Sequence, residues 1–140
     1  MASTTNDSET PFWIACENGQ IEVVKLLLKD ERVEVNQANH YNRTRLHIAC
    51  KNGHTEVVRL LLNAERVDIN KGDILGTTPF YIACWYGYIE IVELLLNDQR
   101  VDINKPNKNE ATPFYVACWN GHIEIVKLLL NDQKVDINRP

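Results

Sequence analysis

The sequence predicts an all-α solenoid in which four helix-turn-helix units of one design are stacked in a row. The stretch TPFYIACWYGYIEIVELLLNDQRVDIN begins at Thr78 and returns at Thr112 with five differences. Two further copies begin at Thr10 and Thr44, so each copy starts 34 residues after the previous one. Every copy also carries a glycine stop and a second apolar run with helical spacing. A fixed period of this length indicates a solenoid, whose units bury their apolar faces only by stacking on one another.

The first helix of each unit is marked at both ends. In the last copy, Thr112 is a good N-cap because its hydroxyl can accept a hydrogen bond from the first turn. Pro113 suits the first helical position, where its missing N–H costs nothing. The apolar run that follows predicts a helix of about eight residues. Gly121 then ends the helix, since glycine adopts the left-handed conformation without steric penalty.

A second helix follows, and an arm connects it with the next unit. In HIEIVKLLL, Ile123, Val126 and Leu130 recur at helical spacing, and the helix is expected to end near Asn131. The VDIN segment alternates apolar and polar residues, as a short extended arm does. One unit therefore consists of two antiparallel helices and a hairpin arm.

The period also predicts the domain organisation. We expect a flexible tail over residues 1–9 and one repeat domain over residues 10–140. The expected repeats are 10–43, 44–77, 78–111 and 112–140, and the last is incomplete. The fourth repeat keeps the apolar residues of the third, although a terminal repeat normally has a polar outer face. Either the chain is a fragment of a longer array, or this uncapped fourth repeat stacks end to end on another molecule.

The pattern resembles the ankyrin repeat, whose signature is T-P-L-H-x-A. TRLHIACKNGH, from Thr44 to His54, matches it most closely, and the motifs recur in register from residue 10 to residue 140. The resemblance implies an ankyrin-repeat solenoid with β-hairpin or loop arms and a concave face that binds partner proteins. It also implies that asparagines at the ends of such arms can be hydroxylated. The candidates are Asn36, Asn70, Asn104 and Asn138, which are also expected to hydrogen-bond the adjoining loop.

Each unit is one residue longer than the 33-residue ankyrin pattern, and the arm tips depart from it. The tip DILGT keeps a glycine, whereas Asn42 and Glu110 stand at the same position in the neighbouring arms. If this position has a positive φ, Glu110 is strained by about 1 kcal/mol, because a side chain there crowds the backbone.

The cysteines do not predict a disulfide or a metal site. They occupy one helix position in successive repeats, and packed helices stand about 8–10 Å apart, too far for a disulfide or a shared zinc. We interpret them as small buried apolar residues, and they are Cys16, Cys50, Cys84 and Cys118.

The histidines do not predict catalysis. His47 is expected to hydrogen-bond Thr44 and its neighbours, and His54 and His122 share a position that other residue types fill in the remaining repeats. We therefore expect no catalytic, cofactor-binding or metal site.

Charge and composition limit the classes of partner and the cellular compartment that we expect. A net charge of -4 without a Lys/Arg run argues against nucleic acid, whose phosphates require a clustered basic face. No apolar run approaches the roughly 18 residues that a membrane span needs. The start MASTTNDSET lacks the basic and apolar regions of a signal peptide, so we expect a cytoplasmic protein.

Binding specificity is expected at the positions where the repeats differ in sequence, which are the arm tips and the ends of the first helices. Repeats one and two carry Glu17 and Lys51 where the others carry tryptophan, so the fold does not require an aromatic group there. We expect Trp85 and Trp119 to lie side by side and, with Tyr86, to anchor a partner. The expected partner-binding residues are Trp85, Tyr86, Trp119, Asn120, Ile74, Leu75, Tyr41, His40, Arg43, Lys108, Asn109 and Lys51.

These observations predict a non-enzymatic module that binds a protein or peptide on its concave face. Two alternatives stay open. One is a structural or self-associating array without a specific ligand, and the other is a targeting module that belongs to a larger protein.

Overall fold

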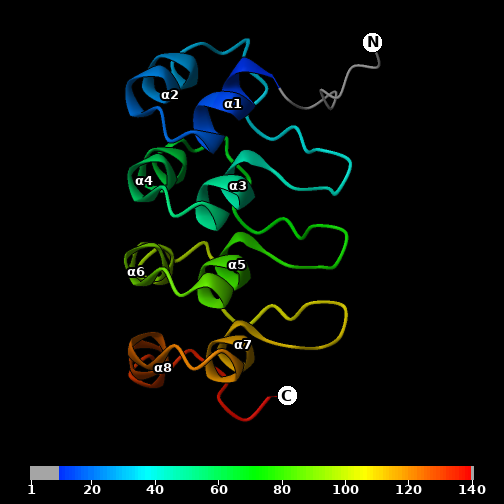
Figure 1. The fold of residues 1–140 in the computed structure, drawn as a ribbon, viewed down its shortest axis with the longest axis vertical. Helices are drawn as coiled ribbons and strands as arrows, with labels where there is room; N and C mark the ends of the chain where they lie inside the picture. Colours follow the sequence, from blue (N-terminus) through cyan, green and yellow to red (C-terminus); the bar gives the residue numbers. More distant parts are fainter. Residues whose placement is uncertain (1–9, 140) are drawn as a thin grey trace.

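The computed structural model describes residues 10–139 and shows two columns of helices, with loops projecting from the first column (Figure 1). The first column holds α1 (Pro11–Glu17), α3 (Arg45–Lys51), α5 (Pro79–Tyr86) and α7 (Pro113–Trp119). The second holds α2 (Ile21–Leu28), α4 (Thr55–Asn63), α6 (Ile89–Leu96) and α8 (Ile123–Leu130). The predicted all-α solenoid is confirmed. The expected tail, residues 1–9, lies outside the described residues.

Each first helix begins at the predicted threonine and is followed by a glycine. The four threonine hydroxyls accept hydrogen bonds from the backbone N–H three residues later, at 3.1–3.4 Å. Gly53 follows α3 with a φ of 73°, and a Cβ atom there would lie 2.9 Å from Cε1 of Tyr88 in the next repeat. The glycine is therefore required by its backbone conformation and by the close approach of its neighbour.

Small side chains of the first helices form the contact between neighbouring repeats. Ala49, Cys50, Ala83 and Cys84 are completely buried, and burial raises the pKa of both thiols. Cys118 is exposed, so the prediction that all four cysteines are buried is wrong for the fourth repeat. The physical reason is that no helix of residues 10–139 packs beyond α7 and α8.

The arms are loops, and no strand is present in the described residues. Each tip is a tight turn; in the first arm the Asn42 N–H donates to Asn39 O at 2.8 Å. Neighbouring arms share one backbone hydrogen bond each: Ile74 N–H donates to Tyr41 O, and Lys108 N–H donates to Leu75 O, both at 2.9 Å. One bond per pair does not make a β ladder, so of the two expected forms of the arm, hairpin or loop, the described residues have the loop.

Asparagines at the ends of the arms join successive repeats, as predicted. In the middle of the stack, Asn70 Nδ2 donates to Arg100 O at 2.7 Å, and Asn70 Oδ1 accepts from Asp102 N–H at 2.8 Å. Asn36 and Asn104 make the same two bonds with their following repeats. Each of these amides thus satisfies two backbone groups across a joint.

Two arm tips hold a non-glycine residue at positive φ. Asn42 has a φ of 60° and Glu110 a φ of 65°, so the expected left-handed conformation of Glu110 is confirmed. Asparagine tolerates this region better than glutamate, because its short side chain bonds locally. Glu110 is the strained position of the two.

Replacing Asn70 with alanine is expected to lower the free energy of unfolding by about 1–2 kcal/mol, because two hydrogen bonds across a joint are lost. Asn138 is the matched control, since it occupies the same position in the fourth repeat and has no following repeat in residues 10–139. Asn138→Ala is expected to have a much smaller effect in dilute solution. Urea unfolding of both variants measures the difference, and equal losses would contradict this role of the amide.

Replacing Glu110 with glycine is expected to raise the free energy of unfolding by about 0.5–1 kcal/mol, because it relieves the positive-φ strain. Glu110→Ala removes the same charge and retains the strain, so it should give no gain. A gain from alanine equal to that from glycine would assign the effect to the charge.

Candidate functional site

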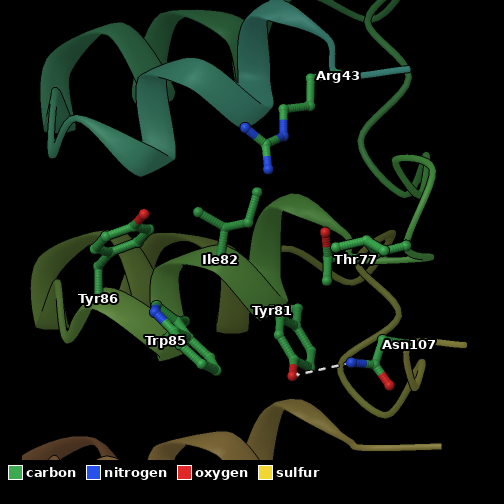
Figure 2. Close-up of a pocket in the computed structure, with 8 residues that line it drawn as sticks. Arg43, Thr77, Tyr81, Ile82, Trp85, Tyr86 and Asn107 are labelled. Atoms are coloured by element: carbon green, nitrogen blue, oxygen red, sulfur yellow. Dashed lines mark hydrogen bonds between the residues drawn. The ribbon is translucent and has the colours of Figure 1, made fainter. Parts of the chain in front are cut away.

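A hollow of about 320 Å³ lies between α5 and the arms on either side of it, and Figure 2 shows the side chains that line it. Tyr81 and Ile82 form its buried floor. Trp85 and Tyr86 come from the last turn of α5, and both are 44% exposed. We call this hollow the α5 groove, and its lining residues are Arg43, Leu75, Thr77, Tyr81, Ile82, Trp85, Tyr86 and Asn107.

Polar groups stand among the apolar ones in the α5 groove. The Asn107 amide Nδ2 donates to the hydroxyl oxygen of Tyr81 at 3.2 Å. Arg43 reaches from the first arm toward Ile82, with its terminal nitrogens over the groove (Figure 2). The groove therefore combines aromatic and aliphatic surface with hydrogen-bond donors, which is the composition of a recognition site.

The structure brings four of the twelve predicted site residues into the α5 groove: Arg43, Leu75, Trp85 and Tyr86. Trp119 is 73% exposed on the next helix and stacks on Tyr115, with ring centroids 6.2 Å apart. It extends the aromatic surface toward the fourth repeat without lining the groove.

The remaining predicted residues lie at the arm tips and at the ends of α3 and α7. At the first tip, Tyr41 packs against His40 with ring centroids 4.1 Å apart, and Arg43 lies over the Tyr41 ring. Ile74, Lys108 and Asn109 are exposed on the following tips, and Lys51 is half-buried at the end of α3.

The expected partner-binding residues did not include Thr77, Tyr81, Ile82 and Asn107, which also line the groove. Tyr81 and Ile82 fall inside the apolar run of the first helix, where a residue that forms core is indistinguishable from one that forms the floor of a groove. The available signal was that Tyr81 replaces the histidine of the T-P-L-H-x-A signature. Asn107 opens its arm tip, and its side chain accepts bonds from Asn109 and Ala111 N–H.

Two of the three joints between repeats are closed by a pair of side chains that donate to a carbonyl at the end of the preceding first helix. The predicted site residue Asn120 belongs to one such pair, so its amide has a stacking role. The pairs are Asn52 Nδ2 and His54 Nε2 with Glu17 O (3.1 and 2.7 Å), and Asn120 Nδ2 and His122 Nε2 with Trp85 O (2.9 and 2.8 Å).

The joint between the second and third repeats lacks this pair. Tyr86 and Tyr88 occupy the two positions, and their rings stack on each other with centroids 6.0 Å apart. Within residues 10–139, no side chain donates to the equivalent carbonyl, that of Lys51. The third repeat therefore lacks the two hydrogen bonds that close the other joints, and the ring of Tyr86 lies in the α5 groove instead.

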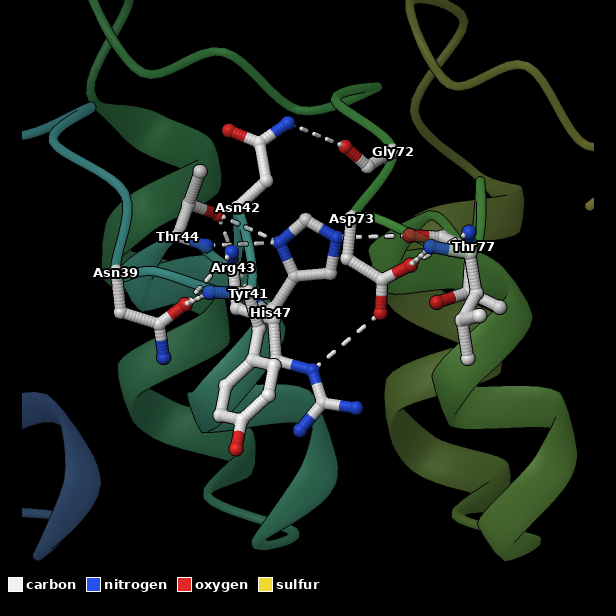
Figure 3. Close-up of polar contacts among 10 residues, drawn as sticks. Asn39, Tyr41, Asn42, Arg43, Thr44, His47, Gly72, Asp73 and Thr77 are labelled. Atoms are coloured by element: carbon white, nitrogen blue, oxygen red, sulfur yellow. Dashed lines mark hydrogen bonds and ion pairs between the residues drawn. The ribbon is translucent and has the colours of Figure 1, made fainter.

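An ion pair between half-buried Arg43 and buried Asp73 links the first and second arms beside the groove (Figure 3). Asp73 Oδ2 accepts from Arg43 Nε at 3.3 Å, while Oδ1 accepts from Leu75 and Thr77 N–H at 2.9 and 3.0 Å. Burial acts to raise the pKa of Asp73, but the bonds from Thr77, Leu75 and Arg43 outweigh it and hold the pKa below its ordinary value. The charged carboxylate thereby fixes Arg43 at the rim of the groove.

His47 joins its own helix start to the second arm, and its predicted bond with Thr44 is confirmed. Thr44 N–H donates to Nδ1 at 3.0 Å, so the proton lies on Nε2, which donates to Thr77 O at 2.9 Å (Figure 3). Burial lowers the pKa of His47 to about 4, although the Thr77 carbonyl and Asp73 act in the opposite direction. Protonation of Nδ1 would abolish its bond from Thr44.

This arrangement predicts an acid-sensitive contribution to stability. The folded state holds His47 neutral, whereas the unfolded chain takes up a proton near pH 6.5, so stability falls as pH decreases from about 6.5 to about 4. The loss attributable to His47 is at most about 3 kcal/mol. His47→Gln is expected to remove this part of the pH dependence in urea unfolding at pH 7 and pH 4.5. Equal pH dependence in both proteins would contradict the assignment.

Two further properties concern the described part of the chain. No group of three His, Cys, Asp or Glu side chains within residues 10–139 is arranged to hold a metal ion. None of the helices there has both the length and the apolar character that crossing a bilayer requires.

Comparison with known proteins gives one family. A model of ankyrin repeats in three copies matches residues 1–73 and again residues 65–140. The chain matches no protein in the curated set that was searched. Ankyrin repeats generally serve as protein–protein interaction modules and are typically not enzymes. Because the two matches together span the whole chain, this chain belongs to the ankyrin repeat family.

Proposed function

We propose that this chain is a non-enzymatic module that binds a protein or peptide segment in the α5 groove. The observation that carries the proposal is that the third repeat has a tyrosine, Tyr86, at the end of its first helix. Asparagine fills its position in the other three repeats, and in two of them its amide closes a joint. A residue that forgoes a stacking bond and remains 44% exposed beside a hollow is better explained by recognition than by folding.

The neighbouring position supports the same proposal. Trp85 lies where the first two repeats carry Glu17 and Lys51, so an aromatic group is not needed to build the stack. Half-exposed tryptophan and tyrosine are the residue types that dominate binding energy at protein interfaces. The family's general role in protein–protein interaction agrees with this reading.

The groove favours an extended segment with an apolar side chain as the ligand. A hollow of about 320 Å³ accommodates such a side chain, and exposed Leu75 and Ile74 continue the apolar surface along the arm tip. The terminal nitrogens of Arg43 can donate to a carbonyl or carboxylate of the segment, because Asp73 engages Nε. Trp119 supplies a second aromatic contact one repeat further along.

A second candidate function is self-association, and it concerns the ends of the stack rather than the groove.

Nucleic-acid binding is disfavoured, because it requires a surface rich in lysine and arginine, whereas this chain has a net charge of -4.

The test begins with peptide ligands selected from a random library on the immobilised wild-type chain. Tyr86→Asn is expected to weaken their binding at least about tenfold, because a central aromatic contact is lost. The same change should alter the free energy of unfolding by less than about 1 kcal/mol, since a regained amide bond offsets the lost ring stacking. Fluorescence anisotropy and urea unfolding measure the two quantities.

Trp85→Lys, which copies the second repeat, should weaken the same ligands to a similar degree. Leu26→Ala is the matched control, because Leu26 is an exposed apolar residue on α2, away from the groove. Trp119→Ala, measured separately, reports whether the ligand reaches the fourth repeat. Wild-type affinity in both groove variants would refute the proposed site.

A further inference from the structure

The two ends of the stack expose the surfaces that the interior repeats use to pack on each other. Leu130 on α8 is 53% exposed, whereas Leu96, its counterpart in the third repeat, is 7% exposed beneath the fourth. At the other end, Val23 on α2 is 45% exposed, whereas its counterpart Val57 is completely buried against the first repeat. We call these two surfaces the α8 end and the α2 end.

The α8 end also carries the groups that form hydrogen bonds at the interior joints, and within residues 10–139 no side chain of a following repeat meets them. The Trp119 carbonyl is equivalent to those of Glu17 and Trp85, which accept two side-chain bonds each from the following repeat. An added Cβ on Gly121 would meet no atom within 4 Å, whereas the equivalent Gly19, Gly53 and Gly87 each lie under a side chain of the next repeat. Among the described residues, nothing accepts from Nδ2 of Asn138.

The α2 end carries the matching donors. In the first repeat, Asn18 occupies the position of Asn52 and Asn120, and Gln20 occupies the position of His54 and His122. Amide nitrogens at both positions can donate to a carbonyl placed as Trp119 O would be.

Arg32 adds a further match at the α2 end. Its counterpart Arg100 pairs with Asp98 at 2.6 Å and at the same time donates to Leu62 O, near the C-terminus of α4, at 2.6 Å. Arg32 pairs with Asp30 in the same way, also at 2.6 Å, and its guanidinium is exposed. It is therefore preformed to donate to the C-terminal end of a second-column helix in another molecule.

We propose that a second copy of this chain stacks head to tail, with its α2 end on the α8 end of the first. The two surfaces continue the interface that already joins the repeats inside one chain. In the stacked pair, Asn18 and Gln20 donate to Trp119 O of the other copy, and Arg32 donates to Leu130 O. Because the contact joins two different surfaces, each added copy presents a new free end, and the assembly grows as a linear series.

Sedimentation velocity of the full chain over a wide concentration range tests the proposal. The weight-average mass is expected to rise with concentration and to pass that of a dimer. Leu130→Glu and Val23→Glu each place a charge on one end and should each be monomeric alone. Leu75→Glu is the matched control, because Leu75 is 58% exposed on an arm tip, and it should associate like the wild type. Circular dichroism melting establishes that all three variants are folded.

Mixing the two end variants distinguishes head-to-tail stacking from a symmetric contact. Leu130→Glu retains an intact α2 end and Val23→Glu an intact α8 end, so the mixture should form a dimer that does not grow further. A wild type that stays monomeric up to its solubility limit would overturn the proposal. So would a Val23→Glu protein that dimerises alone, or a mixture of folded variants that stays monomeric. Tyr86→Asn, a groove variant, should leave association unchanged, so this test and that of the proposed function fail independently.

Discussion

Stacking of one repeat on the next is the interaction on which the whole structure depends. A pair of short helices cannot bury both of its apolar faces, so each repeat of this chain completes its core with residues of its neighbours. The fully buried Ala49, Cys50, Ala83 and Cys84 lie at such contacts, where small side chains let two helices approach closely. The glycines after α1, α3 and α5 permit the same approach, because a side chain of the next repeat lies against each of them.

The polar part of each joint supplies register. An asparagine at the end of an arm and, at two of the three joints, a pair of donors meet backbone groups at fixed positions in the adjoining repeat. Apolar contact alone would tolerate sliding, whereas these bonds are satisfied in only one alignment. Residues that take no part in the joints are free to vary, and they gather at the arm tips and around the α5 groove.

Much of this architecture could be predicted from the sequence, because the 34-residue period carries both the helix boundaries and the stacking. Thr44, His47 and Asn70 have the partners that their positions in the repeat imply. The exposure of Cys118 could not be predicted from the repeat pattern, since burial of that position depends on a neighbour rather than on the repeat itself. The floor of the α5 groove escaped for a similar reason, because Tyr81 and Ile82 have the apolar character of core residues and only three-dimensional packing separates the two roles.

The joint between the second and third repeats has a consequence for motion. Tyr86 and Tyr88 replace the donor pair found at the other two joints, so the end of α3 meets the third repeat through ring packing without those two directional bonds. Asn70, Arg100 and Lys105 still form hydrogen bonds across this joint at the arms. Because each repeat of a linear array contacts only its neighbours, the ends of α3 and α5 are expected to shift locally where the donor pair is absent. The α5 groove spans this joint, since Arg43 reaches it from one side and Asn107 from the other. A ligand that contacts both sides would hold the ends of the two helices together and restrict this local motion.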